Sequence, residues 1–292
     1  MPWAVAIKII LAPMGGAEGA EATFLNALYV GRHLGAHVEA FCVSLDPRDS
    51  VAYMAEGMTS NMIQDIMSAV EKEGEERRER AYEQFSRLCY EAGAPITEGL
   101  SGVGYSASFA TAVGREDDLL AVRGRLSDLI VAARSGGKGD SQRTTLEIAL
   151  LETGRPVLLA PPNGAKSFGK TVSIAWNGSV EVVRAIGGSA GLHFLSQADR
   201  VVIMVVPEAF PAATHAADLV NYLACHDIEA KVAQIDDSAR PIGHALLEKS
   251  KEVGADMMVM GAYTHSRLRH MMIGGPTSVV LQNAEIPVLM AH

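Results

Sequence analysis

Cysteine and positive charge are scarce in this 292-residue chain, and each shortage excludes a class of protein. Its cysteines, Cys42, Cys89 and Cys225, are scattered, odd in number and without C-x-x-C spacing. This pattern excludes a disulfide scaffold and predicts reduced, mostly buried thiols in a cytosolic compartment. Lys and Arg number 25 against 34 Asp and Glu, for a net charge of −9. A duplex nucleic-acid binder usually needs a basic face, so that class is excluded, whereas a small local anion site remains compatible.

Long hydrophobic runs are also absent. No stretch approaches the ~18 apolar residues that a membrane helix requires. The opening segment, MPWAVAIKIILAPMGG, has no basic region before its apolar part, and Lys8 interrupts that part. It is therefore expected to be a strand rather than a signal peptide, and the protein is expected to be cytoplasmic, with no membrane partner. A hydrophobic content of 48% provides material for a core, and the length suggests about two domains.

The chain contains an internal repeat. SDLIVAA at 127–133 matches ADMMVMGA at 255–262, and RPVLLAP at 155–161 matches IPVLMAH at 286–292. The first pair has the form of a buried parallel strand, and the second is a short apolar strand opened by proline. The repeat predicts a first domain over 1–162, a linker over 163–170 and a second domain over 171–292.

The front halves of the two domains match as well. AIKIILAPMGG (6–16) and TVSIAWNGS (171–179) each predict a strand followed by a small polar turn. The remaining predictions come in pairs: helices at about 18–34 and 180–195, second strands at 37–45 and 200–207, and third strands near 95–100 and 229–235. Alternating strands and helices indicate an α/β fold: two tandem, open, parallel five-stranded sheets with helices on both faces.

The first domain is longer than the second because of an insertion at about 47–68. It is rich in methionine (Met54, Met58, Met62 and Met67) and leads into a long charged helix. Methionines at helical spacing are more often core residues than a binding surface.

One motif matches a nucleotide-binding pattern at every specified position. GAKSFGKT (164–171) fits G-x-x-x-x-G-K-[ST], the phosphate loop. Such a loop must follow a strand and open a helix, whose amides bind the phosphate. A strand is predicted before it, but the repeat identifies the segment from Thr171 as another strand. The motif is therefore interpreted as a turn-rich linker with no role in binding.

Three further patterns are interpreted as structural. SGGKGDS (135–141) resembles the loop of ATP pyrophosphatases, but it has one extra residue and follows the fourth strand instead of the first. GGSAG (187–191) matches the nucleophile elbow, yet it falls inside a predicted helix, where small residues allow close packing. His33 and His37 are separated by a change from helix to strand, so they cannot share a helical face around a metal ion. No catalytic residue and no metal ligand is predicted.

The strongest signal for chemistry is the stretch from Met260 to Leu281. Gly261 ends the fourth strand of the second domain, and Gly274, Gly275 and Pro276 then open a helix. The amides at a helix start bind phosphate, and the carboxyl edge of an open α/β sheet is the usual ligand site. Hydroxyls at positions 277 and 278 and arginines at 267 and 269 add donors and positive charge. The alternative interpretation is a surface loop with a capped helix and solvated arginines.

These motifs resemble the universal stress protein family in its tandem two-domain form. The marks are MGAYTHSRLRHMMIGG, IPVLMAH, VSIAWNGS and the repeat itself, and the resemblance covers nearly all of both halves. Nucleotide-binding members carry G-x-x-G-x9-G-[ST], a loop that wraps the phosphates and ribose of ATP. Here Gly261 and Gly274 match, Thr264 replaces the second glycine, and Gly275 takes the Ser/Thr position. Asn177 stands where the family usually has an acid.

The resemblance implies that ATP or AMP is the ligand, with Mg²⁺ able to accompany ATP. Thr264 adds a Cβ where the backbone approaches phosphate, whereas Asn177 can still hydrogen-bond adenine or ribose. In the first domain, Gly15 takes the acidic position and the loop is three residues shorter, so that domain is expected not to bind nucleotide. The implied nucleotide-binding residues are Ala175, Trp176, Asn177, Val206, Met260, Gly261, Tyr263, Thr264, Arg267, Gly274, Gly275, Pro276 and Thr277.

The family also implies a regulatory or protective role in stress, with slow ATP hydrolysis as the most chemistry expected. Its domains pair through their last strands, here 156–160 and 286–291, which predicts an internal pseudo-dimer; a homodimer and unidentified protein partners are further expectations. Two alternatives stay open. One is an interaction module without nucleotide that works through the Met-rich insertion, which Thr264 and Gly275 favour. The other is an adenylating or ATP-pyrophosphatase-type enzyme, for which the turn WNGS after the first strand is a poor match.

Overall fold

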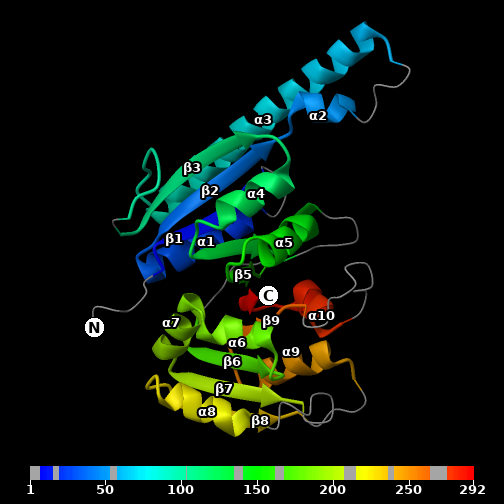
Figure 1. The fold of residues 1–292 in the computed structure, drawn as a ribbon. Helices are drawn as coiled ribbons and strands as arrows, with labels where there is room; N and C mark the ends of the chain where they lie inside the picture. The colour runs from blue at the N-terminus through cyan, green and yellow to red at the C-terminus, as the bar shows by residue number, and fades with distance from the viewer. Residues whose placement is uncertain are drawn as a thin grey trace. The chain divides into compact units, whose positions relative to one another are not determined.

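The computed structural model describes residues 7–15, 20–52, 58–102, 104–134, 141–161, 168–206, 215–235, 240–263 and 275–292 (Figure 1). The chain divides into two compact units. The N-terminal unit comprises Lys8–Val131, and the C-terminal unit comprises Ala132–His292 together with Met1–Ile7.

Strands and helices alternate in the N-terminal unit, as the sequence pattern predicts. The strand order is β3-β2-β1-β4, and both β2 and β4 pair with β1 in parallel. Helices α1 and α3 pack together, and an aromatic cluster of Phe24, Phe85 and Phe109 lies between them and the sheet. The elements are β1 (Ile9–Pro13), α1 (Ala20–Leu34), β2 (His37–Ser44), α2 (Pro47–Ala52), α3 (Ser60–Ala92), β3 (Ser106–Val113), α4 (Glu116–Gly124) and β4 (Leu129–Ala133).

The C-terminal unit repeats this order and adds one strand from the first repeat. Its order is β5-β10-β9-β6-β7-β8. All neighbours are parallel except β5 and β10, which are antiparallel with Leu158 opposite Leu289. The elements are α5 (Ser141–Glu152), β5 (Val157–Ala160), β6 (Thr171–Trp176), α6 (Val180–Gly187), α7 (Ser189–Gln197), β7 (Arg200–Val205), α8 (Ala216–Ala224), β8 (Ala230–Gln234), α9 (Ile242–Glu252), β9 (Met257–Gly261), α10 (Pro276–Asn283) and β10 (Val288–Ala291).

The pairing of β5 with β10 confirms that the two repeats meet through their last strands. Every residue of both strands is buried, which explains their uninterrupted apolar sequences VLLA and VLMA. The predicted boundary between repeats at residue 162 stays a prediction, because the compact units are defined by packing. On that criterion β5 belongs with its partner β10 in the C-terminal unit.

The order of the strands determines where the helices lie. Right-handed crossovers from β6 through β7 to β8 move one way across the sheet, and those from β8 through β9 to β10 move the other way. This places α6, α7 and α8 on one face and α9 and α10 on the opposite face. On that second face, Ser173 of β6 and Ser250 of α9 lie within 2.9 Å of each other through their hydroxyl oxygens, and both are buried.

The third strand of the first repeat was predicted at 95–100, and this prediction is wrong. The strand is β3, Ser106–Val113, and the predicted segment contributes a single bridge between Ile96 and Ala107. Pro95 and Gly99 break up the earlier segment, whereas SASFATAV contains neither proline nor glycine. In the second repeat, the prediction at 229–235 is confirmed by β8.

The single helix predicted over 180–195 is two helices, α6 and α7. Gly188 lies between them with extended backbone, φ −65° and ψ 159°. A Cβ atom at Gly191 would lie 1.9 Å from the Ala185 carbonyl oxygen, so the two helices need glycine where they meet. The GGSAG pattern therefore spans a helix–helix junction, and its small residues serve close packing, as predicted.

The phosphate-loop pattern lies between two strands. Strand β5 ends at Ala160 and β6 begins at Thr171, so the described part of this segment contains no helix start. Phe168 is buried and stacks edge-on against Phe194 of α7, with ring centroids 5.1 Å apart. The end of the linker is thus anchored to the C-terminal unit.

Candidate functional site

Three strand ends of the C-terminal unit lie side by side at one edge of the sheet. Strand β6 is flanked by β7 and β9, with Ala175 opposite Met260 and Trp176 opposite Val205. Because all three strands are parallel, the residues that follow them emerge at the same edge. Predicted site residues from three distant parts of the sequence are therefore neighbours.

The turn after β6 is held by its own hydrogen bonds. The Ser179 amide donates to Asn177 Oδ1 at 3.1 Å, and the Val182 amide donates to Ser179 Oγ at 3.3 Å, which caps α6. Gly178 has φ +72°, a conformation that favours glycine. The side-chain oxygen of Asn177 thus orders the turn. The NH₂ group of the same side chain is the group suited to donate to a ligand.

Trp176 adds a feature that the sequence did not reveal. Its indole Nε1 is buried and has no hydrogen-bond partner among the described residues. Buried N–H groups in native proteins are nearly always paired. Among the described residues, this indole N–H beside the candidate site is therefore a donor without an acceptor.

At the end of β9, Gly261 packs against a helix. A Cβ atom there would lie 2.7 Å from the Val182 amide nitrogen and 2.9 Å from the Glu181 Cβ. The glycine is therefore required by the close approach of α6. Tyr263, two residues later, is buried and has φ +58°, which is uncommon for a residue with a side chain. Such backbone conformations cluster at functional sites.

Helix α10 begins at this same edge with an open N-terminus. Its N-cap is Gly275, which makes no side-chain capping bond, and Pro276 occupies the first turn. A Cβ atom at Gly275 would meet no atom of the described residues within 4 Å. Thr277 Oγ1 accepts a hydrogen bond from the Tyr263 amide at 3.4 Å, which ties the helix start to the end of β9. An uncapped helix start of this kind suits an anion.

The remaining predicted residues, Thr264, Arg267 and Gly274, lie outside the described residues. The same is true of Gly136 and Gly137 in the shorter loop of the first repeat. The structure therefore brings together the ends of β6, β7 and β9 with the start of α10, and the loop that joins β9 to α10 stays a prediction.

The corresponding edge of the N-terminal unit is filled by an arginine. Gly15, at the position equivalent to Asn177, leaves room for Arg77 of α3: a Cβ on Gly15 would lie 2.5 Å from Arg77 Nη2. That Nη2 lies 3.6 Å from the Glu116 carboxylate, and apolar side chains line the small hollow around it. Gly15 stands where the resemblance implies an acidic residue, and the Arg77 side chain of α3 takes up the space beside it.

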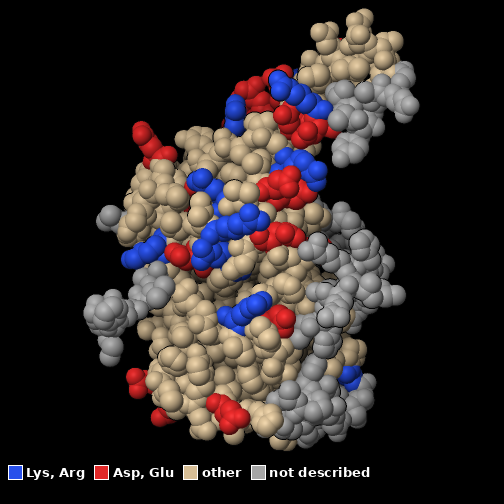
Figure 2. All heavy atoms as spheres, in the orientation of Figure 1, with Lys and Arg blue, Asp and Glu red and all other residues tan. Residues whose placement is uncertain are grey.

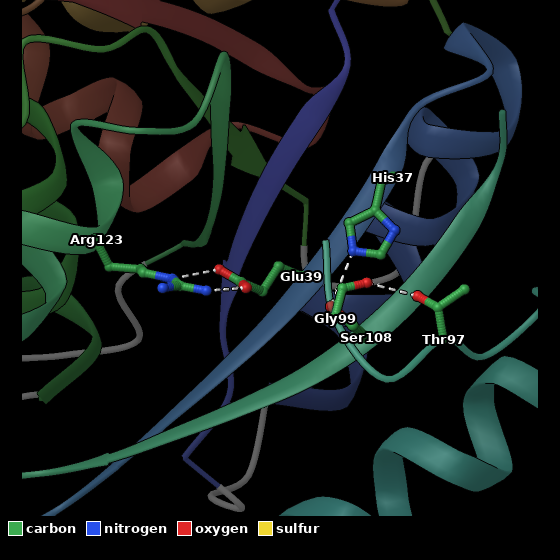
Figure 3. A network of polar contacts seen from close by, with 6 residues as sticks. All are labelled: His37, Glu39, Thr97, Gly99, Ser108 and Arg123. Atoms are coloured by element: carbon green, nitrogen blue, oxygen red, sulfur yellow. Dashed lines mark hydrogen bonds and ion pairs between the residues drawn. The ribbon is translucent and has the colours of Figure 1, made fainter. Parts of the chain in front are cut away.

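A second polar group in the N-terminal unit has a structural role. His37 of β2 is buried, and its ring nitrogens lie 2.8 Å from the hydroxyls of Ser106 and Ser108. Figure 3 shows the contact with Ser108. Burial lowers the pKa of His37, although the nearby Glu39 opposes this. The Glu39 carboxylate, also buried, pairs with Arg123 of α4. Both nitrogens of the histidine are satisfied and no water reaches the ring, so a catalytic or metal-binding role is not supported.

The two buried thiols also lack the features of reactive groups. Cys42 and Cys89 are buried, as predicted, whereas Cys225 is exposed. Burial raises the pKa of Cys42, and it raises the pKa of Cys89 to about 12. Neither is a thiolate at neutral pH. Among the described residues there is no group of three or more metal-binding side chains, and no helix is long and apolar enough to cross a membrane.

Comparisons with known proteins agree with this architecture. The universal stress protein family model matches residues 195–292. A universal stress protein of Synechocystis is 41% identical over 51 residues, which is 16% of this chain and 18% of that protein. The aligned region thus covers less than a fifth of the length of this curated relative.

Two solved structures share the fold along the whole chain. A universal stress protein from Archaeoglobus fulgidus superposes with a TM-score of 0.67 at 17% identity, covering 97% of this chain and 95% of that one. A protein of unknown function from Pseudomonas aeruginosa superposes with a TM-score of 0.53 at 14% identity, covering 99% of this chain and 94% of that one. At these identities the likeness concerns the fold.

Proposed function

Since this chain belongs to the universal stress protein family, in its tandem two-domain form, we propose that its C-terminal unit binds ATP or AMP and that the protein has a regulatory or protective role in the cytoplasm. The observation that carries this proposal is the convergence at one sheet edge of the Asn177 turn, the strained residue Tyr263 and the uncapped start of α10.

The groups at this edge fit the parts of a nucleotide. The first-turn amides of α10 suit a phosphate, because they carry the positive end of the helix dipole and have no side-chain cap. The NH₂ group of Asn177 suits the adenine or ribose. The indole N–H of Trp176, which has no partner among the described residues, offers a further donor. Arg267, in the loop between β9 and α10, would add charge to the phosphate subsite, and Mg²⁺ would accompany ATP through its phosphates.

Binding rather than catalysis is the proposed role. At this edge His292 Nδ1 lies 3.0 Å from the Ala262 carbonyl oxygen and Glu181 packs against Gly261, so both groups have a structural contact, and the chain would hold and orient the nucleotide. A regulatory protein needs no more than a nucleotide-dependent difference in structure or stability, with slow hydrolysis as the upper limit of chemistry.

The first experiment is direct. Purified protein is denatured and the released nucleotides are identified, and titration calorimetry with ATP and AMP then measures affinity. Gly274→Val should abolish binding, because a branched side chain would occupy the path by which the backbone approaches phosphate. Gly136→Val, in the shorter loop of the first repeat, is the matched control and should leave the affinity unchanged.

Thr264→Gly is the sharper variant, since it restores the family pattern. It should tighten ATP binding if the altered loop weakens a genuine site. If the wild type binds neither ATP nor AMP and Thr264→Gly gains no affinity, the nucleotide proposal is wrong.

A second candidate, an interaction module without nucleotide, would then take its place. It is favoured by the first turns of α3, where Met62 is 49% exposed and Ile63, Ile66, Met67 and Val70 are partly exposed along one stripe. Figure 2 shows charged side chains gathered further along α3 and none on the visible surface of its first turns. The adenylating-enzyme alternative has no such support, and release of pyrophosphate from ATP in the presence of an acceptor would be needed to revive it.

A further inference from the structure

Strand β3 forms one edge of the sheet in the N-terminal unit (Figure 1). In a parallel sheet, alternate residues direct both backbone groups to the same side. The Gly114 amide bonds inward to Ser44 of β2, whereas Ala107 bonds outward, to the Pro95 carbonyl and the Thr97 amide. By this alternation Phe109, Thr111 and Val113 also direct their N–H and C=O groups outward. In the part of the chain that the structure describes, the outward groups of Phe109, Thr111 and Val113 have no backbone partner.

This edge lacks the usual protection against pairing. Exposed edge strands are normally short or carry charge or proline. Strand β8, the corresponding strand of the second repeat, follows this rule with five residues that include Lys231. Strand β3 has eight residues, SASFATAV, without a charge or a proline. The two strands occupy the same place in their repeats, so the lack of charge and the greater length are features of the β3 sequence and not of the fold.

The outward-facing segment is complementary to itself. It reads Phe109-Ala110-Thr111-Ala112-Val113, which is nearly the same in both directions about Thr111. We propose that two copies of this chain pair through β3, antiparallel and with a two-fold axis at Thr111. Phe109 then lies opposite the second copy's Val113, and the two Thr111 residues face each other. Aromatic with β-branched and Thr with Thr are favourable cross-strand pairs.

The surroundings of β3 set the limits of this contact. The segment around Pro95 and Thr97 already occupies the edge at Ala107, so only the outward groups from Phe109 to Val113 are open. Phe109 is held by α3, with its ring 5.3 Å from Tyr82 and 5.4 Å from Phe85. Tyr82 is 51% exposed beside the edge and would be partly covered by a second copy. A two-fold arrangement closes on itself, so the contact produces a dimer rather than a filament.

This dimer is separate from the pairing of β5 with β10, which lies within one chain, and it does not depend on nucleotide. The contact is short, so the dimer is expected to be weak and to dissociate on dilution. Sedimentation velocity over a range of protein concentrations measures it directly.

Thr111→Pro is the first test. Its amide points outward, so proline removes a donor of the dimer without breaking the ladder to β2. The dimer dissociation constant should rise by about tenfold or more, while the unfolding transition stays close to that of the wild type. Val232→Pro on β8 is the matched control, because its amide also points outward, and it should not change the dissociation constant. A monomeric wild type at every concentration, or a dimer that Thr111→Pro leaves unchanged, would overturn the proposal.

Crosslinking tests the register. With Cys225 replaced by serine, Thr111→Cys places two thiols opposite each other at the axis, where Cα atoms of a hydrogen-bonded pair lie about 5.5 Å apart, a spacing that a disulfide can span. Mild oxidation should therefore give a covalent dimer. Val113→Cys places each thiol opposite Phe109 and should not crosslink. Equal crosslinking of the two variants, or none with Thr111→Cys, would contradict this register.

Discussion

Gly261 and Gly187 lie in the same unit, yet the neighbours of each glycine differ. At Gly261 an added Cβ would lie 2.7 Å from a backbone nitrogen of α6, which cannot move without shifting the helix. At Gly187 the nearest atom would be the Tyr222 hydroxyl at 3.5 Å, an ordinary contact distance. Gly261 is part of the loop pattern of the nucleotide-binding family members. In this chain, the close packing of α6 already requires a glycine at this position.

Gly261→Ala should therefore lower the free energy of unfolding by about 1–3 kcal/mol, the usual cost of overpacking a close contact. Gly187→Ala, the control, should be neutral or stabilising by up to about 1 kcal/mol, because it adds helix propensity at an exposed position. Urea denaturation of both variants measures the difference. Equal stabilities would show that α6 does not approach β9 as closely as described.

His37 makes the stability of the N-terminal unit depend on pH. Burial lowers its pKa in the folded protein below the usual value of 6.5, so in mildly acidic solution the unfolded chain binds a proton that the folded chain does not. The stabilisation is thus fully present above pH 6.5 and is lost as the pH falls through the lowered folded pKa. The slope for one proton is at most about 1.4 kcal/mol per pH unit.

The free energy of unfolding should accordingly fall between pH 7.5 and pH 5.5 in the wild type. His37→Gln should be less stable at pH 7.5 but should lose this part of the pH dependence. Urea titrations at several pH values test both statements, with replacement of the exposed His226 as the control. A slope that is the same in His37→Gln and the wild type would assign the pH dependence to other groups.

At the scale of elements, the phosphate-loop pattern shows how context overrides a motif. Lys170 precedes β6, and its backbone amide donates to the Asp256 carboxylate at 3.3 Å. Asp256 directly precedes β9, so this hydrogen bond links the starts of the neighbouring strands β6 and β9. A working phosphate loop would need a helix in place of that strand.

Lys170→Ala should therefore change the affinity for ATP by no more than about twofold, the effect of an exposed linker charge. Titration calorimetry on the variant and the wild type measures this. A tenfold loss would mean that the lysine contacts the nucleotide and that the segment binds phosphate after all.

The two elements that the sequence pattern misplaced have a common explanation. The β3 segment is SASFATAV, whose small residues give a weak strand signal, so the prediction fell on the more distinctive PITEGL before it. The helix predicted over 180–195 continued through Gly187 and Gly188 because the apolar spacing persists across them. In both places the outcome depends on neighbours in space: Ser44 and His37 of β2 pair with β3, and carbonyls of α6 come so close to Gly191 that no side chain fits.

At the scale of the molecule, the proposed site concerns one unit only. A ligand that binds the folded C-terminal unit stabilises that unit, by about 2.7 kcal/mol at a concentration one hundred times the dissociation constant. At the equivalent edge of the N-terminal unit, Arg77 lies beside Gly15, and the prediction is that this unit does not bind nucleotide.

Hydrogen exchange with and without ATP should therefore show increased protection in β6, β9 and α10, and no change over Lys8–Val131. Gly274→Val should remove the effect. Protection that increased mainly in the N-terminal unit would place the nucleotide there and contradict the proposed site.

The sequence by itself determined the α/β class, the repeat, the position of nearly every strand and the meeting of the repeats through their last strands. It could do so because these features depend on local pattern: apolar runs of strand length, prolines that open strands, and two segments that repeat the same order. It also predicted that the end of β6, the end of β9 and the start of α10 lie at one edge of the sheet, since parallel strands that follow one another through helices place their carboxyl ends together.

Only the tertiary structure decided what depends on distances between segments far apart in the chain. The fit of Gly261 against α6, the place of Arg77 beside Gly15 and the position of β3 at the edge of its sheet all arise from such contacts. No local pattern encodes them, because each requires knowing which side chain or backbone group fills, or fails to fill, the space beside a given residue.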